Sequence, residues 1–262
     1  MKPMISMCGL SKVWNPGTLK ALTAIEDISF DVAPGEFVVL LGPSGCGKSS
    51  LLYLVAGLEA VTGGALLCDG LPIAGPSTER GMIFQEASLY PWLTIADNVS
   101  FGLRLQGVAA SERRASALEL LRKVGLSDAA NKRPEELSGG MRQRAALARA
   151  LAMRPKVLLM DEPFAALDIQ TRAKMQGHLL DAWHASSASV LLVTHSIEEA
   201  LALADRIVVF TARPGRIKEI VPVDLPRPRS IRDPHIIALQ QQLADLLADE
   251  VDRAFLEQEA AI

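Results

Sequence analysis

Apolar and polar residues occur in blocks along the chain, and the blocks predict an α/β protein. Four short apolar runs are typical of buried strands, at residues 36–41, 157–160, 190–193 and 206–210. After the first run comes a Gly-rich loop and then a segment with apolar residues at helical spacing, which Gly57 ends. The order of strand, loop and helix is typical of an α/β core.

The middle of the chain has a different pattern. From about Trp92 to Arg154 it is rich in Ala, Leu, Arg and Glu, which predicts helices, with Ser138 as an N-cap and Pro155 ending the last of them. Strand-like runs return near residue 155. We therefore expect an α/β core that is interrupted by a helical insert.

The residues after 220 form a third segment. Three prolines within seven residues, Pro222, Pro226 and Pro228, predict an extended connector. Asp233 and Pro234 suit the N-cap and first position of a helix. The apolar residues behind them recur every three or four positions: Ile236, Leu239, Leu243, Leu246, Leu247 and Val251. We expect this amphipathic helix to pack on the protein's own core rather than on a partner.

Composition restricts the class of function. With 262 residues, 49% of them hydrophobic, the chain suits one large domain or a core with a subdomain. A net charge of −3, from 27 basic and 30 acidic residues, argues against a general polyanion binder, so no nucleic-acid partner is expected. Three scattered cysteines and the absence of a signal sequence or an apolar span predict a soluble cytoplasmic protein, which another chain must recruit if it works at a membrane.

The segment 42–49, with the sequence GPSGCGKS, fits the pattern G-x-x-x-x-G-K-[ST] between a predicted strand and helix. Glycines let backbone N–H groups approach phosphates, and the positive end of the following helix faces the same oxygens. Lys48 would bind the β- and γ-phosphates and Ser49 would coordinate Mg²⁺. Taken alone, the loop does not distinguish a GTPase, a kinase and an ATPase. The predicted phosphate-binding residues are Gly42, Pro43, Ser44, Gly45, Cys46, Gly47, Lys48, Ser49 and Ser50.

Two adjacent carboxylates, Asp161 and Glu162, follow the apolar run 157–160. Because successive residues of a strand point to opposite faces, the two side chains are not expected to do the same job. Asp161 would bind Mg²⁺, as the acidic residue does in other P-loop enzymes. Glu162 would polarise the attacking water.

Residues 137–144, with the sequence LSGGMRQR, form the most specific segment of the chain. Ser138 would cap a helix whose first turn contains Gly139 and Gly140, which exposes N–H donors to an anion. The segment resembles the signature sequence of ATP-binding cassette (ABC) ATPases, and the resemblance extends over residues 5–220. It implies a P-loop NTPase (RecA-like) core with an ABC-type antiparallel β subdomain and an inserted α-helical subdomain at about 92–154. A C-terminal extension with the amphipathic helix, 221–262, would follow.

The resemblance implies roles for further residues. Gln85 resembles the Q-loop glutamine, which contacts Mg²⁺ and the membrane partner, and His195 resembles the switch histidine that reads the γ-phosphate. Residues 165–168 resemble the D-loop, with Asp168 near the nucleotide. Trp14 stands where the family places an aromatic residue that stacks on adenine, more usually Tyr. The implied catalytic residues are Lys48, Gln85, Glu162 and His195, and the implied Mg²⁺ ligands are Ser49, Gln85 and Asp161.

The resemblance also implies a mechanism. Two cassettes would meet head to tail, so that each ATP lies between one chain's phosphate loop and the signature of the other. The dimer would close with ATP and open on hydrolysis. The segments 91–94, 213–217 and 224–229 resemble the nitrate/sulfonate/taurine group of importers. Because exporter cassettes are usually fused to membrane spans, we expect the energy-coupling ATPase of an importer for a small anion of that type.

The expected partners follow from this interpretation. They are a second copy of the chain, integral membrane permease subunits and, indirectly, a periplasmic or extracellular solute-binding protein. The chain would lie peripherally at the cytoplasmic face of the membrane and use ATP and Mg²⁺. The alternative is a soluble ABC ATPase without a transport role, acting in cluster assembly, DNA repair or translation.

Overall fold

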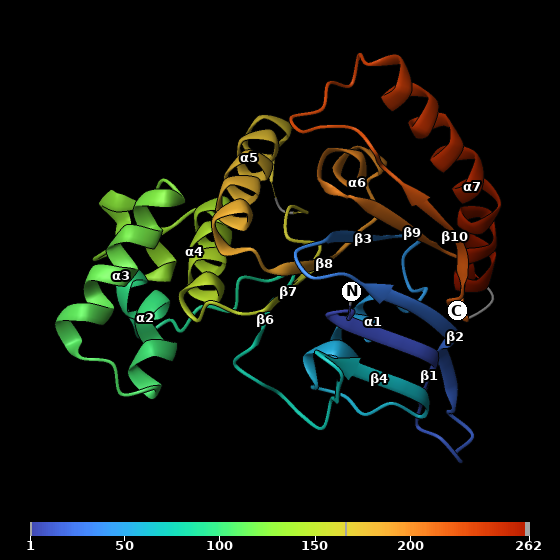
Figure 1. Cartoon of the computed structure of the whole chain (residues 1–262), viewed down its shortest axis with the longest axis horizontal. Helices are drawn as coiled ribbons and strands as arrows, with labels where there is room; N and C mark the ends of the chain where they lie inside the picture. Colours follow the sequence, from blue (N-terminus) through green and yellow to red (C-terminus); the bar gives the residue numbers. More distant parts are fainter. Residues whose placement is uncertain (1, 166, 260–262) are drawn as a thin grey trace. The chain divides into compact units, whose positions relative to one another are not determined.

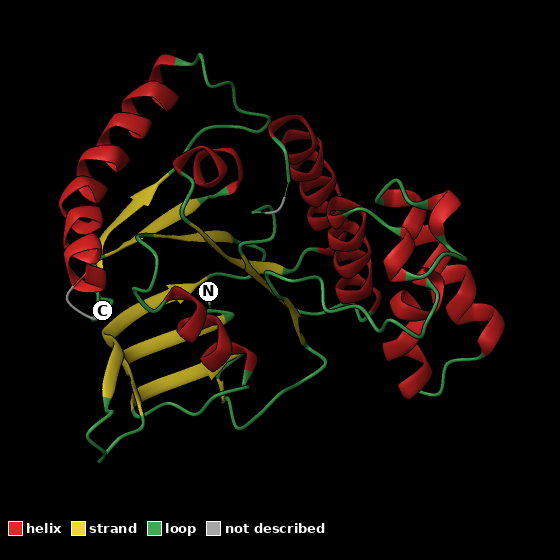
Figure 2. Cartoon of the chain, turned by 180° about the vertical axis from the view of Figure 1, so that it is seen from behind, coloured by secondary structure: helices red, strands yellow, loops and turns green. Residues whose placement is uncertain are grey.

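The structure, a computed structural model, describes residues 2–165 and 167–259 (Figures 1 and 2). It divides into two compact units. The first comprises Met1–Ser77 and Ser189–Ile262, and the second comprises Thr78–Ala188. Ala166, which the sequence analysis assigned to the D-loop, lies outside the described residues.

An antiparallel sheet in the first unit has the strand order β2-β1-β4-β5. Alternate residues of β1, such as Ile5, Met7 and Leu10, are buried, although a shift in register interrupts the alternation between the last two. This sheet is the antiparallel β subdomain that the ABC resemblance implies. Its strands are β1 (Ile5–Trp14), β2 (Leu22–Val32), β4 (Gly63–Cys68) and β5 (Leu71–Pro72).

The other strands of the first unit surround β3, which pairs in parallel with β8 on one side and β9 on the other. Strand β10 runs antiparallel to β9. Every residue of β3 and β8 is buried, which explains why both appear in the sequence as continuous apolar runs. The elements are β3 (Phe37–Leu41), α1 (Lys48–Ala56), β8 (Ser189–Thr194), α6 (Ile197–Leu203), β9 (Arg206–Phe210) and β10 (Ile217–Pro222).

The described residues of the second unit form a parallel strand pair and four α-helices. Helix α4 packs against α2 and α3, and it starts where the sequence predicts, since the Ser138 hydroxyl accepts a hydrogen bond from the Met141 N–H at 3.3 Å. It ends at Ala152, ahead of Pro155. The elements are β6 (Arg80–Ile83), α2 (Ile95–Leu105), α3 (Ala110–Lys123), α4 (Gly139–Ala152), β7 (Val157–Asp161) and α5 (Ile169–Ser186), with short 3₁₀ turns at Ser127–Ala129 and Pro134–Glu136.

The C-terminal helix α7 (Pro234–Glu259) packs on the first unit, against α6 and β9 (Figure 1). Residues 223–233 lead to it without regular structure, and Asp233 caps it by accepting the His235 N–H at 2.9 Å. Leu243 and Leu247 are buried, which confirms that this helix packs on its own core, whereas Val251 is 51% exposed. Among the described residues, no helix is long and apolar enough to cross a membrane.

The packing of α7 predicts unequal effects of two truncations on its opposite faces. Leu243→Ala removes a side chain that is fully buried, and we expect it to lower the free energy of unfolding by about 2–5 kcal/mol. Ile237→Ala, at a side chain that is 53% exposed, should change it by no more than about 0.5 kcal/mol. Urea unfolding followed by circular dichroism measures both. Equal effects would show that α7 is not packed as described.

Candidate functional site

The phosphate loop, residues 42–47, encloses the side chain of the lysine that follows it. The Lys48 ammonium donates to the carbonyl oxygens of Gly42 at 2.9 Å and Pro43 at 2.6 Å, and it lies 3.4 Å from the Cys46 sulfur. Lys48 is only 4% exposed. A buried ammonium needs partners for its three N–H donors, and the loop supplies them. The positive charge is therefore fixed at the concave side of the loop.

Gly47 is required by both backbone angle and space. It is the N-cap of α1 with φ 98°, a conformation that L side chains rarely adopt. A Cβ at this position would lie 2.5 Å from the Ala24 carbonyl oxygen on β2. The loop can turn into α1 here only because no side chain is present. The first turn of α1, which includes Ser49 and Ser50, thus starts directly at the loop, with the positive end of the helix beside it.

Cys46 points into the protein rather than toward solvent. It is 1% exposed, and burial raises the pKa of its thiol although Lys48 lies beside it. A thiol in this state is a poor nucleophile. Its place in the loop is thus explained by its small size and its packing.

Trp14, at the end of β1, is tied to the helix that the phosphate loop starts. Its indole N–H points to the Ser50 hydroxyl at 3.4 Å, and the Lys12 ammonium lies 4.3 Å from the ring centroid. Lys12 is itself buried and pairs with Glu59 at 3.0 Å. The partly exposed ring is therefore held with a cation against one face. An adenine ring is the kind of group that would stack on such an aromatic face.

His195 follows β8 directly and is exposed. The residue before it is fixed by a buried hydrogen bond, in which the Thr194 hydroxyl donates to Glu199 at 2.6 Å. The residue after it, Ser196, caps α6 by accepting the Glu199 N–H at 3.3 Å. Glu199 thus fixes the backbone on both sides of His195. Glu199 was not predicted from the sequence, because a glutamate in the first turn of a helix is a common surface residue.

In the second unit, the two residues of the acidic pair lie on either side of the end of β7. Asp161 is the last strand residue and is 5% exposed. Glu162 lies beyond the strand with φ 44°, in the left-handed region, and its carboxylate accepts from the Gln85 amide at 3.4 Å. Strand alternation, from which we predicted different roles, does not extend to Glu162. The left-handed turn separates the two side chains instead.

Three residues that were not predicted from the sequence hold the backbone on both sides of Gln85. Gln143 on α4 donates to the Phe84 carbonyl at 3.3 Å, and Arg149 donates to the Ser88 carbonyl at 2.7 Å. Asn98 on α2 is fully buried and bonds the backbone of residues 90, 93 and 94. The only available signal was a polar residue on the apolar side of a predicted helix.

The signature residues lie at the start of α4. A Cβ at Gly140 would lie 2.8 Å from the Leu167 side chain, so this glycine lets α4 approach the segment before α5, whereas Gly139 faces open space. Asp168 caps α5 by accepting the Thr171 N–H at 2.9 Å, and this interaction lowers the pKa of its carboxyl group. The observed role of Asp168 is to cap a helix. Its contact with the nucleotide stays a prediction.

The predicted site residues thus fall into two groups. The first unit carries Trp14, residues 42–50 and His195, and the second carries Gln85, residues 138–140, Asp161, Glu162 and Asp168. Within the first unit, residues 42–44 and His195 line a groove of about 330 Å³ together with α7. Among the described residues, no three His, Cys, Asp or Glu side chains gather into a metal site.

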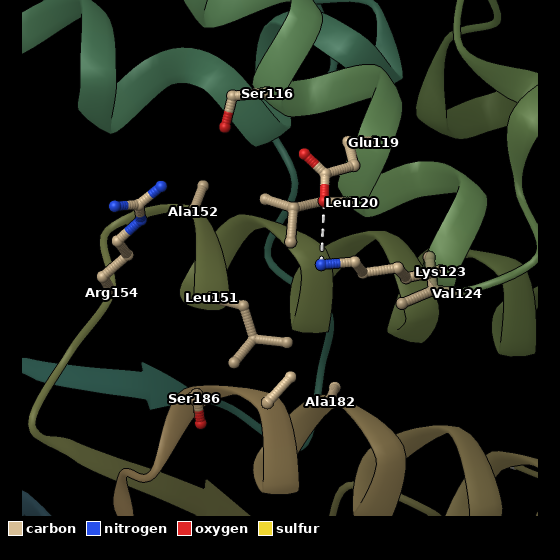
Figure 3. A pocket seen from close by; sticks show the side chains of 11 residues that line it. Ser116, Glu119, Leu120, Lys123, Val124, Leu151, Ala152, Arg154, Ala182 and Ser186 are labelled. Atoms are coloured by element: carbon tan, nitrogen blue, oxygen red, sulfur yellow. Dashed lines mark ion pairs between the residues drawn. The ribbon is translucent and has the colours of Figure 1, made fainter.

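A second cavity, of about 350 Å³, lies among α3, α4 and α5 in the second unit (Figure 3). Its polar lining includes Lys123 and Glu119, which pair with each other at 2.9 Å. None of its lining residues is one that the sequence predicts for the site. We assign it no role in nucleotide chemistry.

Comparison with known proteins decides the family. A family profile described as ABC transporter matches residues 25–165, which include the phosphate loop, the signature and the acidic pair. The chain belongs to the ABC transporter family. As an ABC protein with the ATP-binding domain, it is an ATPase, and its fold class is the one that the sequence predicts.

Relatives cover most of the chain. It is 48% identical over 240 residues to the taurine import ATP-binding protein TauB of Burkholderia pseudomallei, covering 88% of this chain and 92% of that protein. It is 48% identical over 210 residues to the nitrate import ATP-binding protein NrtD of a Synechocystis species, covering 80% and 79%. A dimeric ATP-binding cassette solved with ADP and Pi superimposes with a TM-score of 0.76 at 30% identity, covering 85% of this ABC ATPase and 100% of that chain.

The geometry at Trp14 predicts a test of base stacking. Trp14→Ala should weaken ATP binding about tenfold, because a base stacked on an aromatic ring contributes about 1–3 kcal/mol, whereas Trp14→Tyr should retain most of the affinity. Inorganic tripolyphosphate has no base, so its binding should not change. Isothermal titration calorimetry gives both dissociation constants. An equal loss for ATP and tripolyphosphate would mean that Trp14 only supports the fold.

Proposed function

We propose that this ABC ATPase is the energy-coupling subunit of an importer for a small anion of the nitrate, sulfonate or taurine type. The observation that carries the nucleotide chemistry is the phosphate loop closed around the Lys48 ammonium. The import assignment is supported by the similarity to TauB and NrtD, which covers 88% and 80% of the chain. A soluble ABC ATPase without a transport role is not favoured, because these relatives are importer subunits.

The residues present suit MgATP. Gly47 lets the loop turn into α1 where a Cβ would strike the Ala24 carbonyl, and the loop carbonyls of Gly42 and Pro43 hold the charge of Lys48. Ser49 offers a hydroxyl, Asp161 a buried carboxylate and Gln85 an amide oxygen, a hard oxygen set of the kind that Mg²⁺ prefers. Mg²⁺ in nucleotide sites takes few protein ligands and completes its shell with phosphates and water. When bound, it would neutralise charge on the β- and γ-phosphates.

Each residue then has a distinct task in hydrolysis. Lys48 stabilises the negative charge of the β- and γ-phosphates. Glu162 accepts a proton from the attacking water or polarises it, and its hydrogen bond with Gln85 at 3.4 Å orients the carboxylate. His195, held between Thr194 and the α6 cap, contacts the γ-phosphate. These groups come from both units of the chain.

A second copy of the chain would complete the site. Ser138, Gly139 and Gly140 present the N-terminus of α4, where N–H groups bind anions. In the head-to-tail arrangement these groups reach the γ-phosphate of the other copy's ATP. Contacts that exist only with ATP favour the closed dimer, and their loss on hydrolysis opens it. The opening would do the work of transport at the cytoplasmic face of the membrane.

The segment after Gln85 is suited to receive the membrane subunit. Trp92 is 68% exposed, and its ring packs 5.6 Å from that of Tyr90, which in turn lies 4.6 Å from Phe101. Asn98 fixes the backbone beneath these rings. An exposed aromatic on a rigid frame is typical of an interface anchor, because little order must be gained on binding. A solute-binding protein would engage the membrane subunit on its other side.

The role of Glu162 predicts the behaviour of Glu162→Gln. The amide cannot accept the proton, so turnover should fall about 10²–10⁴-fold while ATP binding changes little. Unhydrolysed ATP should accumulate the dimer, which size-exclusion chromatography with light scattering detects. Glu112→Gln, at an exposed glutamate on α3, is the matched control and should hydrolyse ATP normally. A Glu162→Gln protein that stays monomeric with saturating ATP would contradict the shared site.

The importer assignment is tested by capture from native membranes. Tagged Glu162→Gln protein with ATP should bring down an integral membrane subunit together with a solute-binding protein. Their identities would indicate the substrate. An ATP-bound dimer that captures no membrane subunit would favour the soluble alternative.

The exposed aromatic predicts a separation of coupling from catalysis. Trp92→Ala should lower capture of the membrane subunit about tenfold or more, as truncation of a buried interface Trp does, while the ATPase rate of the isolated protein stays within about twofold. Leu105→Ala, at another exposed apolar residue of the second unit (73%), is the control. Equal capture by Trp92→Ala and the parent would remove this residue from the interface.

A further inference from the structure

The C-terminal helix carries a buried carboxylate that bonds a turn far from it in sequence. Glu250 on α7 is 3% exposed. One carboxylate oxygen accepts the Ala212 N–H at 2.8 Å, and the other accepts from the Lys218 ammonium on β10 at 2.8 Å. A buried charge is costly unless it is paired and hydrogen-bonded, and here it is both. Because Ala212 belongs to the turn 211–216 between β9 and β10, α7 holds that turn.

Hydrogen bonds within the turn link the movement of Ala212 to that of Gly215. The Thr211 N–H donates to the Arg216 carbonyl at 3.0 Å, and the Arg216 N–H donates back to the Thr211 hydroxyl at 3.0 Å. Thr211 and Arg216, the two ends of the turn, are therefore joined by two hydrogen bonds, and Ala212 and Gly215 lie between them. A shift at Ala212 cannot be absorbed within such a short, cross-linked segment without moving Gly215.

Gly215 lies directly against the phosphate loop. Its N–H donates to the Ala24 carbonyl at 2.9 Å, and its own carbonyl accepts the Glu26 N–H at 3.0 Å. A Cβ on Gly215 would collide with the carbonyl oxygen of Cys46. The Ala24 carbonyl is also the group that a side chain at Gly47 would strike. The turn and β2 together thus form the surface on which the phosphate loop rests.

Helix α7 also borders the phosphate loop on a second side. Leu247, Val251 and Phe255 line the groove of about 330 Å³ whose other wall contains Pro43 and His195. These lining residues are independent of the Glu250 bond and come from the same turn of the helix and the turns on either side of it. They place α7 beside the loop at both Cys46, through the turn, and Pro43, across the groove.

We propose that Glu250 is a positioning residue for the phosphate loop. It acts through the Ala212 N–H and the turn 211–216, so that the C-terminal helix becomes part of the nucleotide site. The proposal rests on the proposed function, because it takes residues 42–49 as the phosphate site. It extends that function to a helix outside residues 25–165, which the family profile matches.

The three native cysteines supply a test that does not need nucleotide. Cys8 is exposed, Cys46 lies in the phosphate loop and is 1% exposed, and Cys68 lies in the antiparallel sheet and is 6% exposed. The rate at which N-ethylmaleimide alkylates each one is measured by peptide mass spectrometry on the full chain. Cys46 reports local opening of the loop, Cys68 reports general unfolding and Cys8 reports the intrinsic rate.

Three variants at α7 separate the outcomes. Glu250→Ala removes the acceptor of the Ala212 N–H and should raise alkylation of Cys46 about tenfold or more, with Cys68 unchanged. Glu250→Gln keeps an amide oxygen for the same N–H, so it should restore most of the protection. Asp249→Ala, at the exposed neighbouring acid, should behave as the parent does. Under the same conditions, Glu250→Ala should weaken MgATP binding about five- to tenfold, with Glu250→Gln and Asp249→Ala near the parent value.

Gly215→Ala perturbs the same contact from the other end and serves if Glu250→Ala does not fold. It should also raise alkylation of Cys46 selectively. A joint rise at Cys46 and Cys68, or equal Cys46 rates in Glu250→Ala and Asp249→Ala, would overturn the proposal. Lys48→Ala tests the proposed function separately. If it binds MgATP as tightly as the parent, the phosphate site is wrong, whereas the cysteine rates still report whether α7 holds the loop.

Discussion

The enclosure of one ammonium group by six residues of backbone is the constraint on which the nucleotide site depends. Lys48 bonds the carbonyls of Gly42 and Pro43, which requires the loop to turn back on the helix that it starts. Such a turn brings the loop backbone so close to β2 that position 47 has no room for a side chain. The charge, the glycine and the strand are therefore parts of one arrangement, and none of them can change independently.

The second unit holds its predicted catalytic side chains in a different way. They lie at the ends of strands and not inside a loop. Gln85 and Glu162 follow β6 and β7, two parallel neighbours, so their side chains emerge at the same edge. Helix α4 supports this edge through Gln143 while its own first turn carries the signature glycines. One helix thus links the residues expected to read the partner's nucleotide with the strand end that precedes Gln85.

The sequence predicts most of the fold, because buried parallel strands leave continuous apolar runs and helix ends leave caps. The runs at 36–41 and 190–193 became β3 and β8, and Ser138 and Asp233 cap the helices that follow them. The antiparallel strands were implied only by resemblance, because β1 mixes polar and apolar residues along an interrupted register. These strands form because segments far apart in the sequence pair with one another, and no local sequence pattern indicates that pairing.

The site was predictable where chemistry fixes the residue type, but not where the role of a residue depends on which atoms its side chain bonds in the folded chain. The phosphate loop and the acidic pair have their own local sequence patterns. Glu199, Asn98 and Glu250 have none, since each bonds main-chain atoms or side chains that only the folded chain brings near. The left-handed backbone at Glu162 was likewise unpredictable, because nothing about a glutamate after a strand requires it.

The loop beneath Trp92 has a consequence for how such a protein could diversify. Asn98 ties the backbone of residues 90 to 94 through bonds that do not involve the outward-facing ring. Asn98 thus fixes the backbone conformation of the loop, while Trp92 provides its exposed surface. Substitution of Trp92 would change the exposed surface of the loop and leave its backbone conformation in place. Substitution of Asn98 would remove the hydrogen bonds that fix that conformation. Recognition of different membrane partners would then evolve at the outer position first, without the ATPase having to be rebuilt.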